Sequence, residues 1–334
     1  MRKIQDTRSF KKRSAFSRAI GKVLTYGYGL YVKDRELQKQ APEAARNMEI
    51  LFERVCKFGA EHPKKLLSVL GTVNHWWNHY YNAQEKTKSD EHYLIYTQDD
   101  HAIPFRPEED ILYSYLPAQI ALMAHAVARL TDDKQFAYVL RSFVQINIDA
   151  SHIYNRCQTR MPRFKNHNRV SLSVVQYIDA PTNCCPSLHI AYSTLIYNVA
   201  QRVVQLPKKD PEAWESVQTS TEGMVNSVLY TKQHSLADIA IGILLAQTIF
   251  ERRFNNLPFN NLMHLFPSMA ANNPEIPYGR IRENYEHAID IRKRQNGALD
   301  ELVETYLKDK GFPKIPAKTG NCYYNDKSTE IVEF

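Results

Sequence analysis

Residues 186 to 206 read PSLHIAYSTLIYNVAQRVVQL. Apolar residues recur in this stretch at three- and four-residue steps from Leu188 to Leu206, which is the spacing of one face of an α-helix. Ser187 follows a proline and stands where its side chain can cap or begin that helix. A helix N-terminus offers free backbone N–H groups to an anion, and His189 would lie in the first turn. Such a histidine is more often structural than catalytic, so the neighbouring segments must decide its role.

The same helical spacing extends over much of the chain. It recurs in residues 41–61, 110–130 and 134–150, and from Leu236 to Asn255. The best strand candidate is RVSLSVVQYI, at 169–178. We therefore expect an all-α protein. Loops are expected where proline, glycine and polar residues gather, at 82–109, 160–186 and 206–213 and in the tail from Gly311 onward.

The expected organisation has three parts. Residues 1–100 would form a basic N-terminal arm and flanking helices, residues 101–255 a compact helical core, and residues 256–334 a C-terminal helical extension with an irregular tail. Composition excludes a polytopic membrane protein, because only 43% of the 334 residues are hydrophobic and the mean hydropathy is −0.48. We expect no transmembrane span, since each apolar run is interrupted or too short. No continuous apolar segment resembles a signal peptide, which predicts a cytoplasmic protein, either free or peripheral on a membrane.

The N-terminal arm carries much of the net charge of +7. Its first 22 residues hold eight lysines and arginines, with Phe10, Phe16 and Ile20 interleaved among them. The arm is either a solvated flexible segment or a short amphipathic segment that touches an anionic membrane. We expect no nucleic-acid partner, because no zinc-finger, helix-turn-helix or RNA-binding signature is present. The five cysteines are odd in number and widely spaced, which indicates reduced thiols, and none has the pair spacing of a zinc site.

Two further segments carry charged or histidine side chains. RCQTRMPRF, from Arg156 to Phe164, places three arginines within eight residues, which suits either a multiply charged oxyanion or a solvated surface turn. SVLYTKQHSLADIAIG, from Ser227 to Gly242, places His234 and Asp238 four residues apart. On a helix these two share a face, so the carboxylate can accept from one imidazole nitrogen and leave the other as a nucleophile or base. The alternative is a structural histidine in an ion pair at a helix start.

In this order the three segments resemble the type 2 phosphatidic acid phosphatase superfamily, whose motifs are Lys-x6-Arg-Pro, Pro-Ser-x-His and Ser-Arg-x5-His-x3-Asp. The second motif resembles that of the inositol phosphorylceramide synthase-like branch, with DAPTNCCPSLH from Asp179. The third matches that branch in Thr231, Lys232, Gln233, His234, Asp238 and Gly242, and IPFRPEEDILYSYLP at 103–117 is also similar. The resemblance covers about 150 residues. Three positions depart from the pattern: Arg156 stands where the first motif has its lysine, Phe164 replaces the proline of that motif, and Val228 replaces the arginine of the third.

The resemblance implies a helical bundle of the kind shared with vanadium haloperoxidases, and a metal-independent phosphatase without cofactors. Its substrate would be a lipid or isoprenoid phosphate or diphosphate. His234 would form a phosphohistidine, Asp238 would orient it, and His189 would act as acid and then base. The phosphate would be bound by Arg156, Arg163, Lys232 and the backbone amides near Ser187. Alternatives are phosphotransfer to an alcohol, as in phosphosphingolipid synthesis, haloperoxidase chemistry, and a non-catalytic protein that binds phosphate or phospholipid. The two cysteines before Pro186 would then be small apolar fillers.

Overall fold

The structure is a computed structural model. It describes residues 57–72, 75, 89–113, 115–162, 164, 172, 182–295, 297–317, 323–324 and 331–332. The basic N-terminal arm, Arg163 and all of the strand candidate at 169–178 except Leu172 therefore lie outside the described residues, and the predictions made for them stay predictions.

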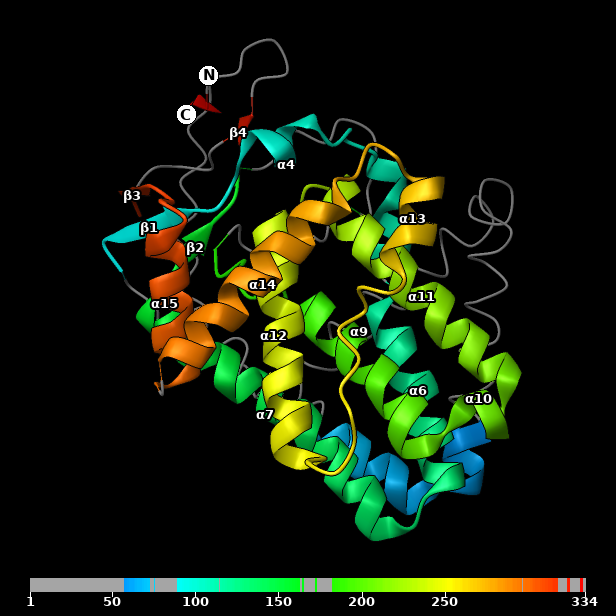
Figure 1. The fold of residues 1–334 in the computed structure, drawn as a ribbon. Helices are drawn as coiled ribbons and strands as arrows, with labels where there is room; N and C mark the ends of the chain where they lie inside the picture. The colour runs from blue at the N-terminus through cyan, green and yellow to red at the C-terminus, as the bar shows by residue number, and fades with distance from the viewer. Residues whose placement is uncertain are drawn as a thin grey trace, which may run out of the picture.

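Helix α9 (Leu188–Asn198) lies at the centre of the fold (Figure 1). It packs against α6 (Leu116–Leu130), α7 (Asp133–Arg156), α11 (Pro211–Tyr230) and α12 (Leu236–Arg253). Every α9 side chain except that of His189 is buried, because the helix is covered on all sides. The sequence prediction of a helix that Ser187 caps is confirmed, since the Ser187 hydroxyl accepts from the Ile190 amide. Beyond Asn198 the helix continues as a π-helical segment, η2 (Val199–Val204).

Three buried polar side chains of this centre, on α6, α9 and α11, are paired with one another. The Ser193 hydroxyl donates to the Gln119 side-chain oxygen at 2.7 Å, and the Gln119 side-chain nitrogen donates to the Ser220 hydroxyl at 2.8 Å. A buried polar group costs free energy unless it has such a partner. These two hydrogen bonds therefore fix the positions of α6, α9 and α11 relative to one another.

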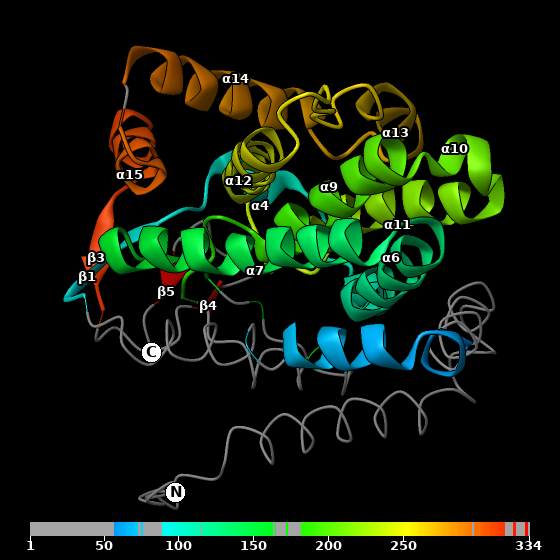
Figure 2. The ribbon, with the colours of Figure 1, turned by 90° about the horizontal axis from the view of Figure 1, so that it is seen from below.

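Further helices cover this centre. Helix α14 (Tyr278–Arg294) lies across α12 on the side away from α7, as Figure 2 shows, and α15 (Leu299–Asp309) packs on α7 and α14. On the opposite side, helical residues 57–61 and 63–72 contact α6 and α7 through Phe58 and Lys65. Shorter helices complete the described chain: α4 (Gln98–Ala102), η1 (Pro107–Glu109), α5 (Asp110–Tyr113), α10 (Leu206–Lys209) and α13 (Phe266–Asn272).

A small sheet lies at one end of the bundle. Strand β1 (Glu91–Leu94) pairs in parallel with β2 (Thr159–Arg160) and antiparallel with β3 (Lys314–Pro316), and β4 (Tyr323–Tyr324) pairs with β5 (Ile331–Val332). The all-α prediction is thus confirmed for the bulk of the described residues but missed these two small sheets, and the tail from Gly311, expected to be irregular, contains β3, β4 and β5. Two predicted loops are also corrected: 82–109 contains β1, α4 and η1, and 206–213 contains α10 and the start of α11. Among the described helices, none combines the length and the apolar character that crossing a membrane requires.

Candidate active site

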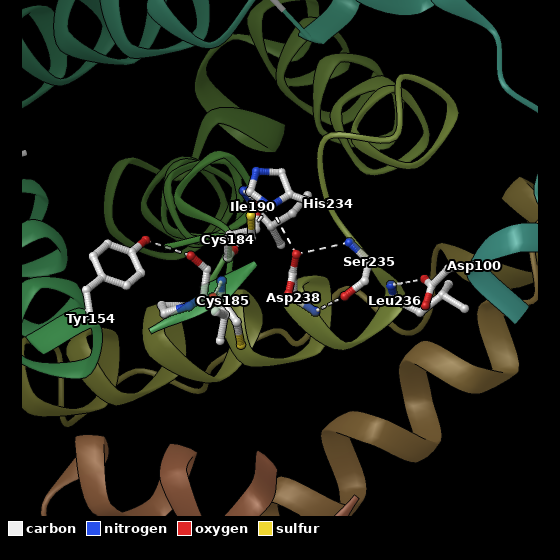
Figure 3. Close-up of polar contacts among 12 residues, drawn as sticks. Asp100, Tyr154, Cys184, Cys185, Ile190, His234, Ser235, Leu236 and Asp238 are labelled. Atoms are coloured by element: carbon white, nitrogen blue, oxygen red, sulfur yellow. Dashed lines mark hydrogen bonds and ion pairs between the residues drawn. The ribbon is translucent and has the colours of Figure 1, made fainter. Parts of the chain in front are cut away.

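His234 lies in the short turn between α11 and α12, and its ring is held at Nδ1. That nitrogen is 3.3 Å from Asp238 Oδ2 and 3.2 Å from the backbone carbonyl oxygen of Cys184 (Figure 3). A backbone carbonyl can only accept, so Nδ1 carries the proton and donates to both oxygens. The lone pair is therefore on Nε2. The four-residue spacing predicted this contact on one helix face; the contact is present, but His234 lies in the turn before α12 and not on a helix.

Asp238 is fully buried and also fixes the start of α12. Its Oδ2 accepts from the Ser235 amide at 3.0 Å, and the Asp238 amide donates to the Ser235 hydroxyl at 3.2 Å, which together form a capping box. Burial raises the pKa of Asp238, and the contact with His234 opposes that rise. The neighbouring Cys185 thiol is also fully buried. Burial and the Asp238 charge hold the pKa of this thiol well above its usual value, so it is an unreactive packing group.

His189 lies in the first turn of α9, next to His234. The two ring centroids are 5.8 Å apart, and the Tyr113 ring stacks on His189 at 4.1 Å. The His189 side chain is half-buried, whereas His234 is buried. Burial, and then the proximity of His234, lower the pKa of His189 to about 3. His189 is therefore neutral in the free protein at neutral pH.

The segment before α9, residues 185–187, is held in place by hydrogen bonds to several other elements. The Cys185 amide donates to the Thr159 hydroxyl at 2.9 Å, and the Tyr154 hydroxyl donates to the Pro186 carbonyl at 2.8 Å. The Ser187 amide donates to the Asp238 carbonyl at 3.2 Å. These contacts place the N-terminus of α9 against the N-terminal half of α12, and this brings His189 and His234 together.

Gly242 permits this close approach of α9 and α12. A Cβ atom at Gly242 would lie 2.8 Å from the Ser187 carbonyl oxygen and 3.1 Å from Ile190 Cβ. Real Cβ atoms essentially never come as near as 2.8 Å to another heavy atom. Close packing of α9 on α12 therefore explains the glycine at position 242. The sequence pattern alone gives no such explanation.

The first turn of α9 retains two amides for an anion. The Ser187 amide donates to the Asp238 carbonyl, and the Ile190 amide donates to the Ser187 hydroxyl at 3.4 Å. Among the described residues, no partner is found for the amides of Leu188 and His189. The anion site near Ser187 stays a prediction, and these two N–H groups are the ones left to bind an anion there.

Two of the predicted cations, Arg156 and Lys232, have partners other than the two histidines, while Arg163 lies outside the described residues. Arg156 lies at the end of α7, where its Nε is 2.7 Å from Glu304, and it also pairs with Asp300 and Glu301 of α15. Lys232 is buried, and its ammonium donates to the backbone carbonyls of Asp100 and Ile103. Burial lowers the pKa of Lys232 to about 8. The structure therefore gives both side chains partners of their own.

Three residues at the site were missed by sequence reasoning: Tyr113, Thr159 and Asp100. The Asp100 carboxylate accepts from the Leu236 amide at 2.7 Å, one residue into α12. Only Asp100 left a local signal in the sequence, because Thr97 and Asp100 have the spacing of a capping box, which they form in α4. The contacts of Tyr113 and Thr159 are long-range, and nothing in the local pattern indicates them.

Comparisons with protein-family models, curated proteins and solved structures found no match to this chain. Membership of the type 2 phosphatidic acid phosphatase superfamily therefore stays a prediction from the motifs. Within the described part of the chain, no group of three or more histidine, cysteine, aspartate or glutamate side chains is arranged to hold a metal ion.

Proposed function

We propose that this protein is a phosphatase that hydrolyses a lipid or isoprenoid phosphate or diphosphate through a phosphohistidine at His234, without a metal ion. The observation that carries the proposal is the orientation of His234. Asp238 and the Cys184 carbonyl hold its Nδ1–H, so Nε2 presents a lone pair, and a second histidine lies 5.8 Å away between ring centroids. The choice of a lipid or isoprenoid ester rests on the motif resemblance.

The proposed reaction has two steps. In the first, His234 Nε2 attacks phosphorus, the bond to the leaving oxygen breaks, and His189 gives that oxygen a proton. In the second, His189 takes a proton from water, the water oxygen attacks phosphorus, and the P–N bond breaks to release inorganic phosphate. Asp238 stabilises the positive charge that the His234 ring carries while it is phosphorylated.

The low pKa of His189 makes its role depend on the substrate. In the free site its pKa is about 3, so it carries no proton to donate at neutral pH. A phosphate dianion bound beside it would raise this pKa, because an opposite charge favours the imidazolium form. A substrate monoanion can also bring the proton with it. His189 therefore becomes an acid only when the phosphate is bound.

Among the described residues, the best candidate site for the phosphate is the N-terminus of α9. The free amides of Leu188 and His189 and the helix dipole both favour a negative charge there. Arg156 and Lys232 are held by other partners, so neither of these two predicted ligands is available to contact the phosphate. We therefore expect weaker binding of phosphate than a site with several arginines would give.

A phosphate-release assay over a panel of lipid and isoprenoid phosphates and diphosphates tests the proposal, with vanadate as an inhibitor. His234→Ala should abolish turnover. His287→Ala is a control, because His287 is a half-buried histidine on α14 that contacts Tyr306 and Asp309 and has no part in the proposed reaction. Full activity of His234→Ala would overturn the proposal. Adding an alcohol acceptor distinguishes hydrolysis from phosphotransfer, which would use the same histidines.

A further inference from the structure

Helix α4 contacts both ends of the turn that carries His234. This turn, Thr231 to Ser235, connects α11 to α12, and the predictions from sequence assigned no role to α4. Before His234, the Lys232 ammonium donates to the carbonyls of Asp100 and Ile103 at the end of α4. After His234, the Leu236 amide donates to Asp100 Oδ1 at 2.7 Å, the contact drawn in Figure 3.

Asp100 is itself rigidly held and buried. Its Oδ2 accepts from the Thr97 amide at 2.9 Å and from the Thr97 hydroxyl at 2.7 Å, and only 3% of its surface is exposed. Burial raises the pKa of Asp100 to about 6, and the nearby Asp238 charge adds to the rise. A buried carboxylate persists only when hydrogen bonds compensate for its lost hydration. Here Leu236 supplies one of these hydrogen bonds, which couples α4 to the start of α12.

The same stretch of chain also reaches the second histidine. From α4 it continues through η1 into α5, whose Tyr113 stacks on the His189 ring. Residues 97–113 therefore contact both the turn of His234 and the ring of His189. A displacement of α4 would change the position of His234 relative to His189, which matters because a shift of about 1 Å can cost about 100-fold in rate.

We propose that Asp100 is a positioning residue of this site, which fixes His234 relative to His189 through its hydrogen bond to the Leu236 amide. The effect on kcat rests on the proposed phosphatase function, whereas the hydrogen bond to Leu236 does not. Asp100 does not contact the reacting phosphate. Its loss should therefore lower kcat and leave KM nearly unchanged, because substrate binding at the start of α9 does not involve α4.

Three variants separate positioning from a general loss of structure. Asp100→Ala removes both oxygens, while Asp100→Asn keeps one oxygen that can accept from Leu236. Thr97→Val is the matched control, because it removes the hydroxyl of the α4 capping box and leaves the Asp100 contact with Leu236 in place. We expect kcat to fall about 100-fold in Asp100→Ala, with partial recovery in Asp100→Asn and a change of less than about threefold in Thr97→Val.

Amide hydrogen exchange at Leu236 provides a readout that does not depend on activity. Its protection should fall in Asp100→Ala and persist in Thr97→Val, measured by mass spectrometry or NMR on the full chain. Unchanged protection at Leu236 in Asp100→Ala would overturn the inference, as would an unchanged kcat in an active enzyme. If wild type releases no phosphate from any substrate while Leu236 loses protection as expected, the proposed function fails and the structural coupling stands.

Discussion

Substituting Gly242 by alanine should destabilise the protein and disturb the site together. The added Cβ would lie 2.8 Å from the Ser187 carbonyl oxygen and 3.1 Å and 3.3 Å from Cβ and Cγ2 of Ile190. The first of these atoms belongs to the backbone at the start of α9, so it cannot rotate away as a flexible side chain can. The α9 and α12 helices must therefore move apart.

Two opposing terms set the size of the effect. Alanine is favoured over glycine inside a helix by about 1 kcal/mol. Overpacking in a well-packed core costs about 1–3 kcal/mol, and the upper end applies here because the clash is with backbone. The net loss in the free energy of unfolding is thus about 1–2 kcal/mol, which lowers the midpoint of thermal unfolding by a few degrees in a chain of this length.

Gly279→Ala is the matched control for this prediction. Gly279 lies in α14, and a Cβ there meets no atom within 4 Å. This variant should gain up to about 1 kcal/mol from helix propensity alone. Both variants are compared with wild type by urea unfolding and by phosphate release. If Gly242→Ala is as stable as Gly279→Ala and equally active, the close approach of Ser187 to α12 is refuted.

The remaining predictions concern His189 and Arg156. Because the pKa of His189 is about 3 in the folded protein and 6.5 in the unfolded chain, the unfolded chain binds more protons between these values, so stability is lost as pH falls below about 6.5. The urea midpoint should therefore change more between about pH 7.5 and about pH 5 in wild type than in His189→Gln. An equal change in both proteins would contradict the lowered pKa of His189. Arg156→Ala should weaken the contact between α7 and α15 and lower the thermal midpoint slightly, with KM for phosphate substrates unchanged. A KM that rises several-fold in Arg156→Ala, with an unchanged midpoint, would instead place Arg156 at the phosphate.

The sequence alone predicted the parts of the fold and site that depend on local spacing. The periodicity after Ser187 predicted a helix and its cap, and the interval between His234 and Asp238 predicted their hydrogen bond, although His234 lies in the turn before α12 and not on a helix face as expected. Both are properties of residues within one or two helical turns of each other. For the same reason α12 was anticipated close to its observed bounds, and α7 except for its last six residues.

Features that depend on distant partners were not predictable in this way. The strand β1 exists because β2 and β3, from far along the chain, supply its hydrogen bonds. Arg156 appears beside Arg160 in the sequence as part of a basic cluster. Its actual partners are Asp300, Glu301 and Glu304, nearly 150 residues away. Tyr113 and Asp100 reach the site from elements whose position is set by the packing of the whole core.

The central claim is that His234 becomes phosphorylated, and a trapped intermediate tests it most directly. His189→Ala is mixed with an aryl phosphate whose leaving group departs without a proton, so that the first step proceeds and hydrolysis of the intermediate is slowed. The reaction is stopped in alkali, where phosphohistidine survives, and the peptides are mapped by mass spectrometry. The account predicts a phosphoryl group on His234. A phosphoryl group on another residue, or release of the aryl alcohol with no protein-bound phosphate at any time, would contradict it.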